Sequence, residues 1–458
     1  MDKDGMERKR SALFGGIAVR TLGMGDSGSD VMEVQSTLRK MGLYGGGVDG
    51  VFGGETRRAV EEFQRRFGLE ADGVIGPQTW GVLTQFLLGY DVYTVRAGDT
   101  FFGIARKYGT DPAAIEAANP AEDPDNLRVG TRVTVPYSFD VVATDTAYTY
   151  EVLMRNIQGL KARYPFLRVS SIGASVLGKS LYALRLGTGA RNVSYNAAHH
   201  ALEWITSPLL MKFAEEYLKA YTFGREIAGR DPRELWDSTS IWLVPMVNPD
   251  GVNLVLNGLT PGDPYYEDLL RWNGGSADFA TVWQANIRGV DLNHNYNAAW
   301  EQSKEAEAGL GITGPGPTRY SGPYPVSEPE TRAMAAFTRS HNFQLVMAYH
   351  SQGRVIYWNF MGLAPDEART IGEALARISG YALEEATGVA SYAGYKDWFT
   401  QDFRRPGYTI EVGEGVNPLP LSQFPQIFEE NLGMLLYAAG GAGSDPPAEP
   451  VSARRGER

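Results

Sequence analysis

His200 and Glu203 combine residue types and a spacing that could hold a metal ion. A separation of three residues places both side chains on the same side of a helical turn. Imidazole and carboxylate groups are ligands of catalytic zinc, which usually takes three from the protein and leaves one position to water. The chain contains no cysteine, so His, Asp and Glu must supply any metal site. On its own, however, an H-x-x-E pair is most often a surface contact.

The third ligand must come from a distant part of the sequence, and His350 is the best candidate. It ends the apolar run L-V-M-A-Y-H and precedes S-Q-G, which places it where a buried strand opens into a loop. Sites in open α/β sheets form at such strand ends. By contrast, His199 should point elsewhere on its turn, and His341 follows a polar helix end. We therefore predict a metal site made of His200, Glu203 and His350.

Glu411 lies in the apolar stretch T-I-E-V-G, where a lone carboxylate is costly unless it is used or paired. Two explanations remain open from the residues alone. The carboxylate could be a buried structural group paired with Arg404 or Arg405, or it could be a catalytic group beside the metal site.

These residues belong to the third and largest segment of the chain, residues 144–440. Buried-strand candidates begin at Ile241 and Leu345, and amphipathic helices are expected at 209–221 and 328–340. Apolar strands that alternate with helices predict an α/β domain whose mixed sheet is flanked by helices on both faces. The tail, residues 441–458, has no core-forming residues and is expected to be disordered.

The first segment, residues 21–90, contains an internal repeat. V-D-G-V-F-G-G-E-T begins at Val48 and A-D-G-V-I-G-P-Q-T begins at Ala71. Each Asp-Gly predicts a tight turn followed by a helix, and the apolar spacing predicts a small three-helix domain. The segment resembles the peptidoglycan-binding domain of cell-wall hydrolases, including D-G-V-F-G-G-E-T-R-R-A-V-E-E-F-Q. The alternative is a generic helical bundle.

The second segment, residues 91–138, reads as strand, two helices and strand. Thr100 or Asp99 should cap the first helix, and A-N-P should end the second. This βααβ order, with Gly-Asp-Thr, Asn-Pro and a final Val-Pro in sequence, resembles a lysin-motif (LysM) module. The resemblance implies binding to glycans that contain N-acetylglucosamine. A spacer domain that binds nothing is the alternative.

The composition restricts the partners and the compartment. A net charge of −11 gives no electrostatic support for nucleic-acid binding. No apolar run approaches the roughly 20 residues that span a bilayer. The first residues do not read as a signal peptide, so we expect a cytoplasmic protein, as in sporulating cells, or export to the cell wall by a route that the sequence does not reveal.

Five motifs of the third segment, taken in order, resemble the zinc carboxypeptidase family. They are H-A-L-E-W, N-P-D-G-V, G-V-D-L-N-H-N-Y, Y-H-S-Q and Y-T-I-E-V-G. The resemblance implies a carboxypeptidase-like fold and one zinc ion held by His200, Glu203 and His350. It also implies that Glu411 is the general base on the zinc-bound water and then the proton donor to the leaving amine.

Two departures from the family bear on the substrate. Carboxypeptidases that trim ordinary C-termini carry Asn-Arg where this chain has Asn293 and His294, and His cannot form the bidentate fork that Arg offers a carboxylate. Asn293 still matches and is expected to orient substrate. For the oxyanion-stabilising arginine of the family, strict register places Gln284, and Arg288 is the nearest cation. Both remain candidates.

Two further positions are expected to touch substrate. The mobile tyrosine of the family corresponds best to Tyr392, with Tyr395 as the alternative. Lys396 matches the position that sets side-chain specificity, where an ammonium would favour a substrate with an extra carboxylate. Lys396 could equally be a structural partner of Asp397.

The wall-binding modules and the altered carboxylate clamp together suggest peptidoglycan as the substrate. The combination is similar to the γ-D-glutamyl-diamino acid peptidases of cell-wall remodelling and sporulation, which implies cleavage of the γ-D-glutamyl to meso-diaminopimelate bond. A carboxypeptidase acting on ordinary peptides is the alternative enzyme. A wall-binding protein with a degenerate peptidase fold is the non-catalytic alternative. The sequence leaves open the stem residue preferred, endo- versus carboxypeptidase action and the oligomeric state.

Overall fold

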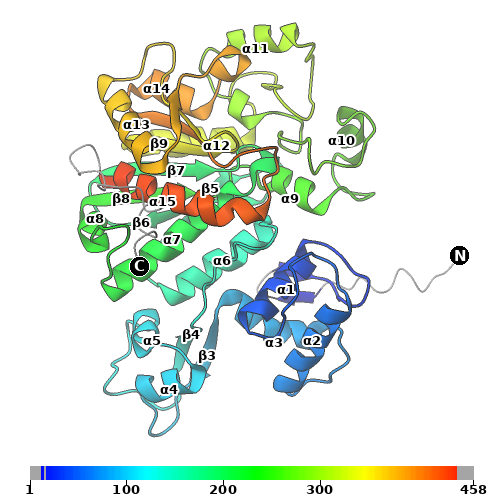
Figure 1. Ribbon diagram of the computed structural model, residues 1–458, viewed down its shortest axis with the longest axis vertical. Coiled ribbons are helices and arrows are strands. Elements are labelled where there is room, and N and C mark those ends of the chain that lie inside the picture. Colours follow the sequence, from blue (N-terminus) through cyan, green and yellow to red (C-terminus); the bar gives the residue numbers. More distant parts are fainter. Residues whose placement is uncertain (1–11, 15–16, 441–458) are drawn as a thin grey trace, which may run out of the picture. The chain divides into compact units, whose positions relative to one another are not determined.

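The computed structural model describes residues 12–14 and 17–440, and the chain divides into two compact units, residues 1–167 and 168–458 (Figure 1). The tail predicted to be disordered lies outside the described residues. Among the helices that the structure describes, none has the length and apolar character needed to cross a membrane.

The elements of the first unit are β1 (Ala12–Phe14), β2 (Ile17–Val19), α1 (Ser29–Lys40), α2 (Gly54–Arg66), α3 (Pro77–Leu88), β3 (Tyr90–Thr94), α4 (Phe101–Tyr108), α5 (Pro112–Ala118), β4 (Arg132–Pro136) and α6 (Tyr150–Arg163).

In each copy of the repeat in the three-helix module, a buried glutamine forms hydrogen bonds to the Asp-Gly turn. Gln35 on α1 donates from Nε2 to Asp49 Oδ1 at 2.8 Å, and its Oε1 accepts from the N–H of Gly50 at 2.9 Å. Gly50 has a φ of 72°, which glycine adopts at little cost. In the second copy, Gln64 on α2 holds Asp72 at the same 2.8 Å. Each Asp-Gly turn is therefore tied to the preceding helix.

The next module has the predicted βααβ order. Strands β3 and β4 pair antiparallel, and the Thr100 side chain caps α4 by accepting from the N–H of Gly103 at 3.0 Å. Asn119 follows α5 and exchanges hydrogen bonds with the main chain of Thr134, with Nδ2 donating at 2.7 Å and Oδ1 accepting at 2.8 Å. The Asn-Pro of the motif thus locks the second helix onto β4.

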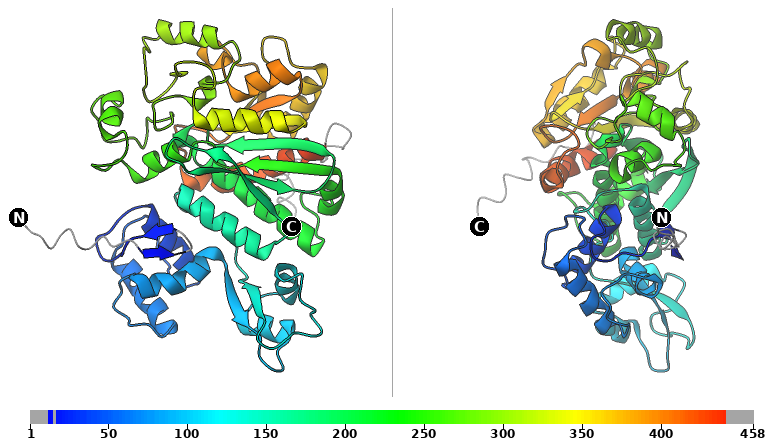
Figure 2. Two further views of the ribbon diagram at one scale, coloured as in Figure 1. Left: turned by 180° about the vertical axis from the view of Figure 1, so that it is seen from behind. Right: turned by 90° about the vertical axis from the view of Figure 1, so that its right-hand side faces the viewer.

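An eight-stranded mixed sheet forms the centre of the second unit, with the order β11-β10-β12-β9-β7-β8-β6-β5 (Figure 2). Four neighbouring strands, β12, β9, β7 and β8, run parallel, and the strands beside them, β10 and β6, run antiparallel to them. The strands are β5 (Arg168–Ala174), β6 (Ser180–Leu186), β7 (Arg191–Ala197), β8 (Thr239–Val244), β9 (Phe343–His350), β10 (Val355–Tyr357), β11 (Ala382–Glu384) and β12 (Gly407–Glu411).

Helices cover both faces of this sheet (Figures 1 and 2). On one face, Phe337 of α12 and Trp398 of α14 share a buried cluster with Val346 of β9. On the other face, the Tyr195 hydroxyl of β7 donates to the Leu435 carbonyl of α15 at 2.8 Å. The α/β domain expected from the sequence is confirmed. Its helices are α7 (Thr206–Phe223), α8 (Pro232–Ser238), α9 (Pro249–Asn257), α10 (Tyr266–Trp272), α11 (Trp300–Gly309), α12 (Pro329–Ser340), α13 (Asp366–Ser379), α14 (Tyr395–Phe403) and α15 (Phe424–Gly440).

Candidate metal centre and active site

The carboxyl ends of the parallel strands bring distant residues together at one edge of the sheet. His350 is the last residue of β9 and Glu411 the last residue of β12, and the two are paired in register across the parallel strands. Strand β7, which pairs with β9 on its other side, ends at Ala197 shortly before His200. Such an edge is where open α/β sheets place their sites.

A short 3-10 turn, η2 (Ala201–Glu203), presents the first two predicted ligands. His200 is the residue that precedes this turn, so the predicted helical spacing is realised in a single tight turn. Asn248 of the N-P-D-G motif stabilises this turn by donating from Nδ2 to the His199 carbonyl at 3.1 Å. The first N–H of the turn donates to the Gln284 carbonyl at 2.9 Å. The turn is thus fixed from two sides.

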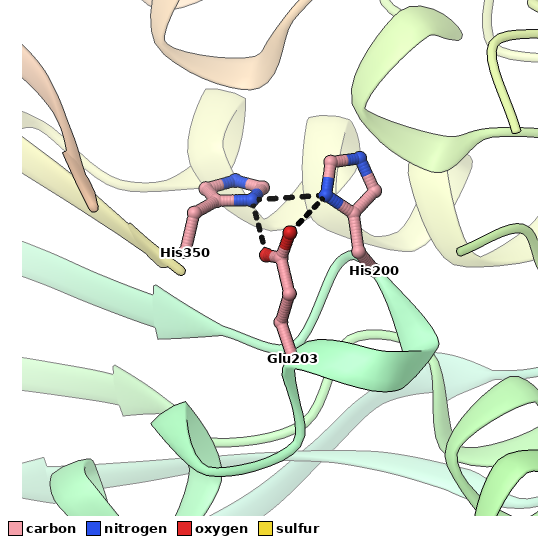
Figure 3. Close-up of side chains that lie close together, drawn as sticks. All are labelled: His200, Glu203 and His350. Carbon is pink, nitrogen blue, oxygen red and sulfur yellow. Dashed lines mark hydrogen bonds and ion pairs between the residues drawn. The ribbon is translucent and has the colours of Figure 1, made fainter. Parts of the chain in front are cut away.

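The three predicted ligands meet at a common centre (Figure 3). Glu203 Oε1 lies 2.9 Å from His200 Nδ1, and Glu203 Oε2 lies 2.8 Å from His350 Nδ1. The two Nδ1 atoms are 3.3 Å apart. The side chains are well buried, with 13% of His200, 4% of Glu203 and 1% of His350 exposed. Three potential metal ligands from distant parts of the sequence therefore face one point.

Asp291 fixes the orientation of the His200 ring by contacting the nitrogen that faces away from the other two predicted ligands. Its Oδ1 lies 3.0 Å from His200 Nε2, and its Oδ2 accepts from the main-chain N–H of Arg319 at 2.9 Å. With Nε2–H donated to Asp291, the Nδ1 lone pair of His200 is free to bind a metal. The sequence interpretation overlooked Asp291, although it lies in the same G-V-D-L-N-H-N-Y motif. The available signal was an acidic residue in the ordered motif that also holds Asn293 and His294.

The electrostatics of the cluster call for a cation. Burial lowers the pKa of His200, but the Glu203 and Asp291 carboxylates outweigh this and raise it well above its ordinary value. Burial raises the pKa of Glu203, but the adjacent His200 and His350 outweigh burial, so the pKa of Glu203 falls below its ordinary value. Burial and the nearby Glu203 carboxylate together raise the pKa of Glu411 well above its ordinary value.

The donor set fits zinc. Two imidazoles and one carboxylate are the ligands of a catalytic His₂Glu zinc site, which keeps a fourth position for water or substrate. Both imidazoles present the same atom, Nδ1, to the centre, and Glu203 presents both carboxylate oxygens. Asp291 bonds the remote nitrogen of His200 and so holds its Nδ1 toward the centre.

The alternative explanation of Glu411, an ion pair with a neighbouring arginine, is wrong. Arg404 donates from Nε to the Gln401 carbonyl at 3.0 Å, and Arg405 donates to the Phe343 carbonyl at 2.6 Å. Both guanidinium groups are thus held by main-chain carbonyls. Glu411 is instead the strand residue paired with His350 across β12 and β9, and after burial the charged groups that shift its pKa are Glu203 and His200.

Gln284 and Arg288, the two candidates for the oxyanion, have different surroundings. The Gln284 main chain contacts the metal-binding turn, and its side-chain oxygen accepts from the hydroxyl of Thr318. Arg288 pairs with Glu328, at 2.8 Å from Nε and 2.7 Å from the terminal nitrogen. The charge of Arg288 is therefore already neutralised by a buried carboxylate.

Asn293 and His294 lie on a second 3-10 turn, η3 (Leu292–His294), directly after Asp291. Asn293 Oδ1 accepts from the N–H of Tyr395 at 3.0 Å, and His294 is 9% exposed. The Asn293 side chain thus ties η3 to the start of α14, and Asp291, which caps η3, contacts His200.

Tyr392 is half-buried in the segment between η4 (Gly388–Ser391) and α14. Tyr395 is fully buried, with its hydroxyl 2.9 Å from that of Thr338, so it is poorly placed to move. Lys396 is also buried, and its Nζ pairs with Asp397 and donates to the Asn359 carbonyl at 2.7 Å. Lys396 thus has the structural partner that the sequence offered as its alternative role, and the substrate-binding roles of Tyr392 and Lys396 stay predictions.

Comparison with protein families assigns all three modules. The zinc carboxypeptidase model matches residues 153–434, which is more than half of the chain. A peptidoglycan binding domain model matches residues 27–83, and a LysM domain model matches residues 93–136. The two resemblances predicted for the small modules are confirmed.

Individual relatives agree with this assignment. The chain is 47% identical over 289 residues to gamma-D-glutamyl-L-diamino acid endopeptidase 1 of Lysinibacillus sphaericus, covering 63% of this chain and 71% of the relative. It is 46% identical over 76 residues to the spore cortex-lytic enzyme of Bacillus cereus, covering 17% of this chain and 29% of the relative.

Among solved structures, thrombin activatable fibrinolysis inhibitor shares the fold, with a TM-score of 0.50 and 16% identity over 69% of this chain and 89% of that one. The family model, the first of these relatives and the ordered motifs lead to one assignment. The chain belongs to the zinc carboxypeptidase family of metallopeptidases, and zinc is the cofactor of that family.

Proposed function

We propose that this peptidase hydrolyses the amide bond between γ-D-glutamate and the following diamino acid in the stem peptides of peptidoglycan. The observation that carries the proposal is the identity with the relative named for this bond. The two wall-binding modules that precede the catalytic domain support it, since their partner is peptidoglycan. The substrate also implies that the enzyme acts where the cell wall is assembled or remodelled, including sporulation.

In the proposed reaction, Glu411 moves the proton. It takes a proton from the attacking water as general base and delivers it to the leaving amine as general acid. Bound to His200, Glu203 and His350, Zn²⁺ would supply a Lewis acid and lower the pKa of water to about 7. Asp291 keeps His200 oriented throughout.

Other side chains would position the substrate. We favour Gln284 over Arg288 for polarising the scissile carbonyl, because Gln284 adjoins the metal-binding turn and Arg288 is paired with Glu328. Asn293 and His294 would replace the Asn-Arg clamp of C-terminal carboxypeptidases, and Tyr392 would close over the substrate. Without the arginine fork, a terminal α-carboxylate loses its bidentate partner.

Digestion of purified muropeptides beside a set of ordinary peptides tests the proposal, with products identified by mass spectrometry. We expect cleavage between D-glutamate and the diamino acid and no trimming of the ordinary peptides. Release of C-terminal residues from ordinary peptides, with muropeptides intact, would instead establish the carboxypeptidase. If a preparation that carries zinc hydrolyses neither substrate, the chain is a wall-binding protein.

Asp291→Asn should weaken zinc binding by about 10- to 100-fold, the usual effect of removing a carboxylate behind a His ligand. Asparagine has almost the same shape but lacks the charge that holds His200 Nε2–H. Competition with a chromogenic zinc chelator measures the affinity. Asp268→Asn, at a partly exposed position on α10, is the matched control and should bind zinc like the parent. Equal affinity of the Asp291 variant and the control would show that the contact is not used.

A further inference from the structure

A hollow of about 510 Å³ lies in the first unit, where the three-helix module meets the LysM module. Its volume falls within the roughly 300–1,000 Å³ typical of ligand pockets. It draws on the end of α2, on α3, on the start of β3, on the end of α4 and on the segment after β4. Both modules therefore contribute to its wall, and neither forms it alone. The lining residues used below are Met41, Arg66, Phe86, Lys107, Tyr137 and Phe139.

Stacked aromatic rings form one wall of this hollow. Phe86 and Tyr137 stack with ring centroids 4.8 Å apart and an angle of 7°, and Tyr137 continues to Phe139 at 5.4 Å and 19°. All three side chains are only half-buried. Aromatic faces are flat, apolar and electron-rich, so they suit the C–H face of a pyranose ring.

Charged side chains border the same hollow. Arg66 is exposed, and within residues 12–14 and 17–440 it forms no ion pair. Lys107 is exposed, and its Nζ lies 4.6 Å from the centroid of the Tyr93 ring. The acid in the lining, Asp91, is already engaged, since it accepts from the Tyr108 hydroxyl at 2.8 Å. The two cations thus outnumber one satisfied carboxylate, which favours an anionic ligand.

We propose that this hollow is a composite glycan-binding site, which takes an N-acetylated sugar that carries a carboxylate. The sugar ring stacks at the Phe139 end of this aromatic wall, because the Tyr137 ring is already stacked against Phe86 and Phe139, and the carboxylate pairs with Arg66. Within peptidoglycan, the N-acetylmuramic acid unit has this chemistry, because a carboxylate-bearing lactyl group is attached to its ring. The proposal rests on peptidoglycan as the partner and is independent of the peptidase reaction.

Met41 provides a local probe of this site in the full chain. It lines the hollow, whereas Met24 is 58% exposed and does not line it. We would label the methionine methyl groups with ¹³C and identify the Met41 and Met24 signals by Met→Leu variants. Two probes would then be titrated separately into the protein, with the two methyl signals recorded by NMR. One probe is a peptide-free tetrasaccharide of alternating N-acetylglucosamine and N-acetylmuramic acid, and the other is N-acetylglucosamine tetramer, which lacks the carboxylate.

We expect the acidic tetrasaccharide to shift the Met41 methyl signal in a saturable way and to leave Met24 unchanged. Arg66→Gln should weaken that binding about tenfold, as expected for the loss of a charge-assisted hydrogen bond. Phe139→Leu keeps an apolar side chain but removes the stacking face, and it should weaken binding of both probes about fivefold. Arg65→Gln is the matched control, since Arg65 is exposed, pairs with Glu62 and does not line the hollow.

Three results would overturn the proposal. The first is a Met41 signal that neither probe moves at millimolar concentration, which would make the hollow only a crevice between modules. The second is equal binding of the two probes, which would remove the role of the carboxylate. The third is an unchanged affinity in both Arg66→Gln and Phe139→Leu. Because both probes lack a peptide, none of these results depends on the hydrolysis reaction proposed above.

Discussion

Glu411→Gln should lower kcat by about a thousandfold while the zinc content stays at that of the parent. General acid–base catalysis contributes about 10²- to 10⁴-fold, and an amide cannot accept the proton of the attacking water. Glutamine fills the same space at the end of β12, so the pairing of this strand with β9 and β10 should persist. The measurements are muropeptide turnover and metal analysis of one preparation.

Glu414→Gln is the matched control for this variant. Glu414 lies three residues further along, is exposed, and pairs with Arg354 at 3.3 Å, outside the metal-binding cluster. Its turnover should equal that of the parent. Turnover within tenfold of the parent, with zinc retained, would remove Glu411 from the proton-transfer role.

The residues that could be predicted from the sequence are those whose chemistry is unusual for their surroundings. His350 at the end of an apolar run and Glu411 inside one are costly unless they are used, and the ordered motifs then connected them to His200 and Glu203. Their adjacency follows from topology, because β9 and β12 are parallel neighbours that end in register. No local pattern reveals that pairing, since β12 follows β9 only after β10, α13, β11 and α14.

The partners of charged side chains were the part that the sequence could not provide. Arg288 was a candidate cation for the oxyanion until the structure placed it against Glu328, 40 residues away in the chain. Lys396 similarly proves to be buried against Asp397 and the Asn359 carbonyl. Such pairings depend on which loops the fold brings together, whereas the turns, caps and strands of the small modules depend on neighbouring residues.

We expect the two wall-binding modules to act on the reaction through concentration. Because they are joined to the catalytic domain in one chain, their binding to the wall should raise the effective concentration of stem peptides without changing the chemical step. Loss of a glycan contact should therefore reduce activity on intact peptidoglycan and spare activity on short soluble muropeptides. Loss of a catalytic group should reduce both.

Replacing a zinc ligand should have the other large effect. His350→Ala should reduce the bound zinc from about one ion per chain to nearly none and abolish hydrolysis, because two protein ligands remain where a catalytic site uses three. His350 is 1% exposed and contributes Nδ1 directly to the centre, so its loss removes one of the three ligands outright.

Zinc-dependent stability separates this loss from simple unfolding. A ligand present at about 1,000 times its Kd stabilises the native state by about 4 kcal/mol, so added zinc should raise the Tm of the parent and not that of His350→Ala. His341→Ala is the control of the same residue type. His341 stacks on Phe343 and meets Trp242 edge to face, so its loss should lower the Tm yet leave the zinc response intact. If His350→Ala still bound zinc tightly and turned over muropeptides, the metal would have to lie elsewhere in the chain.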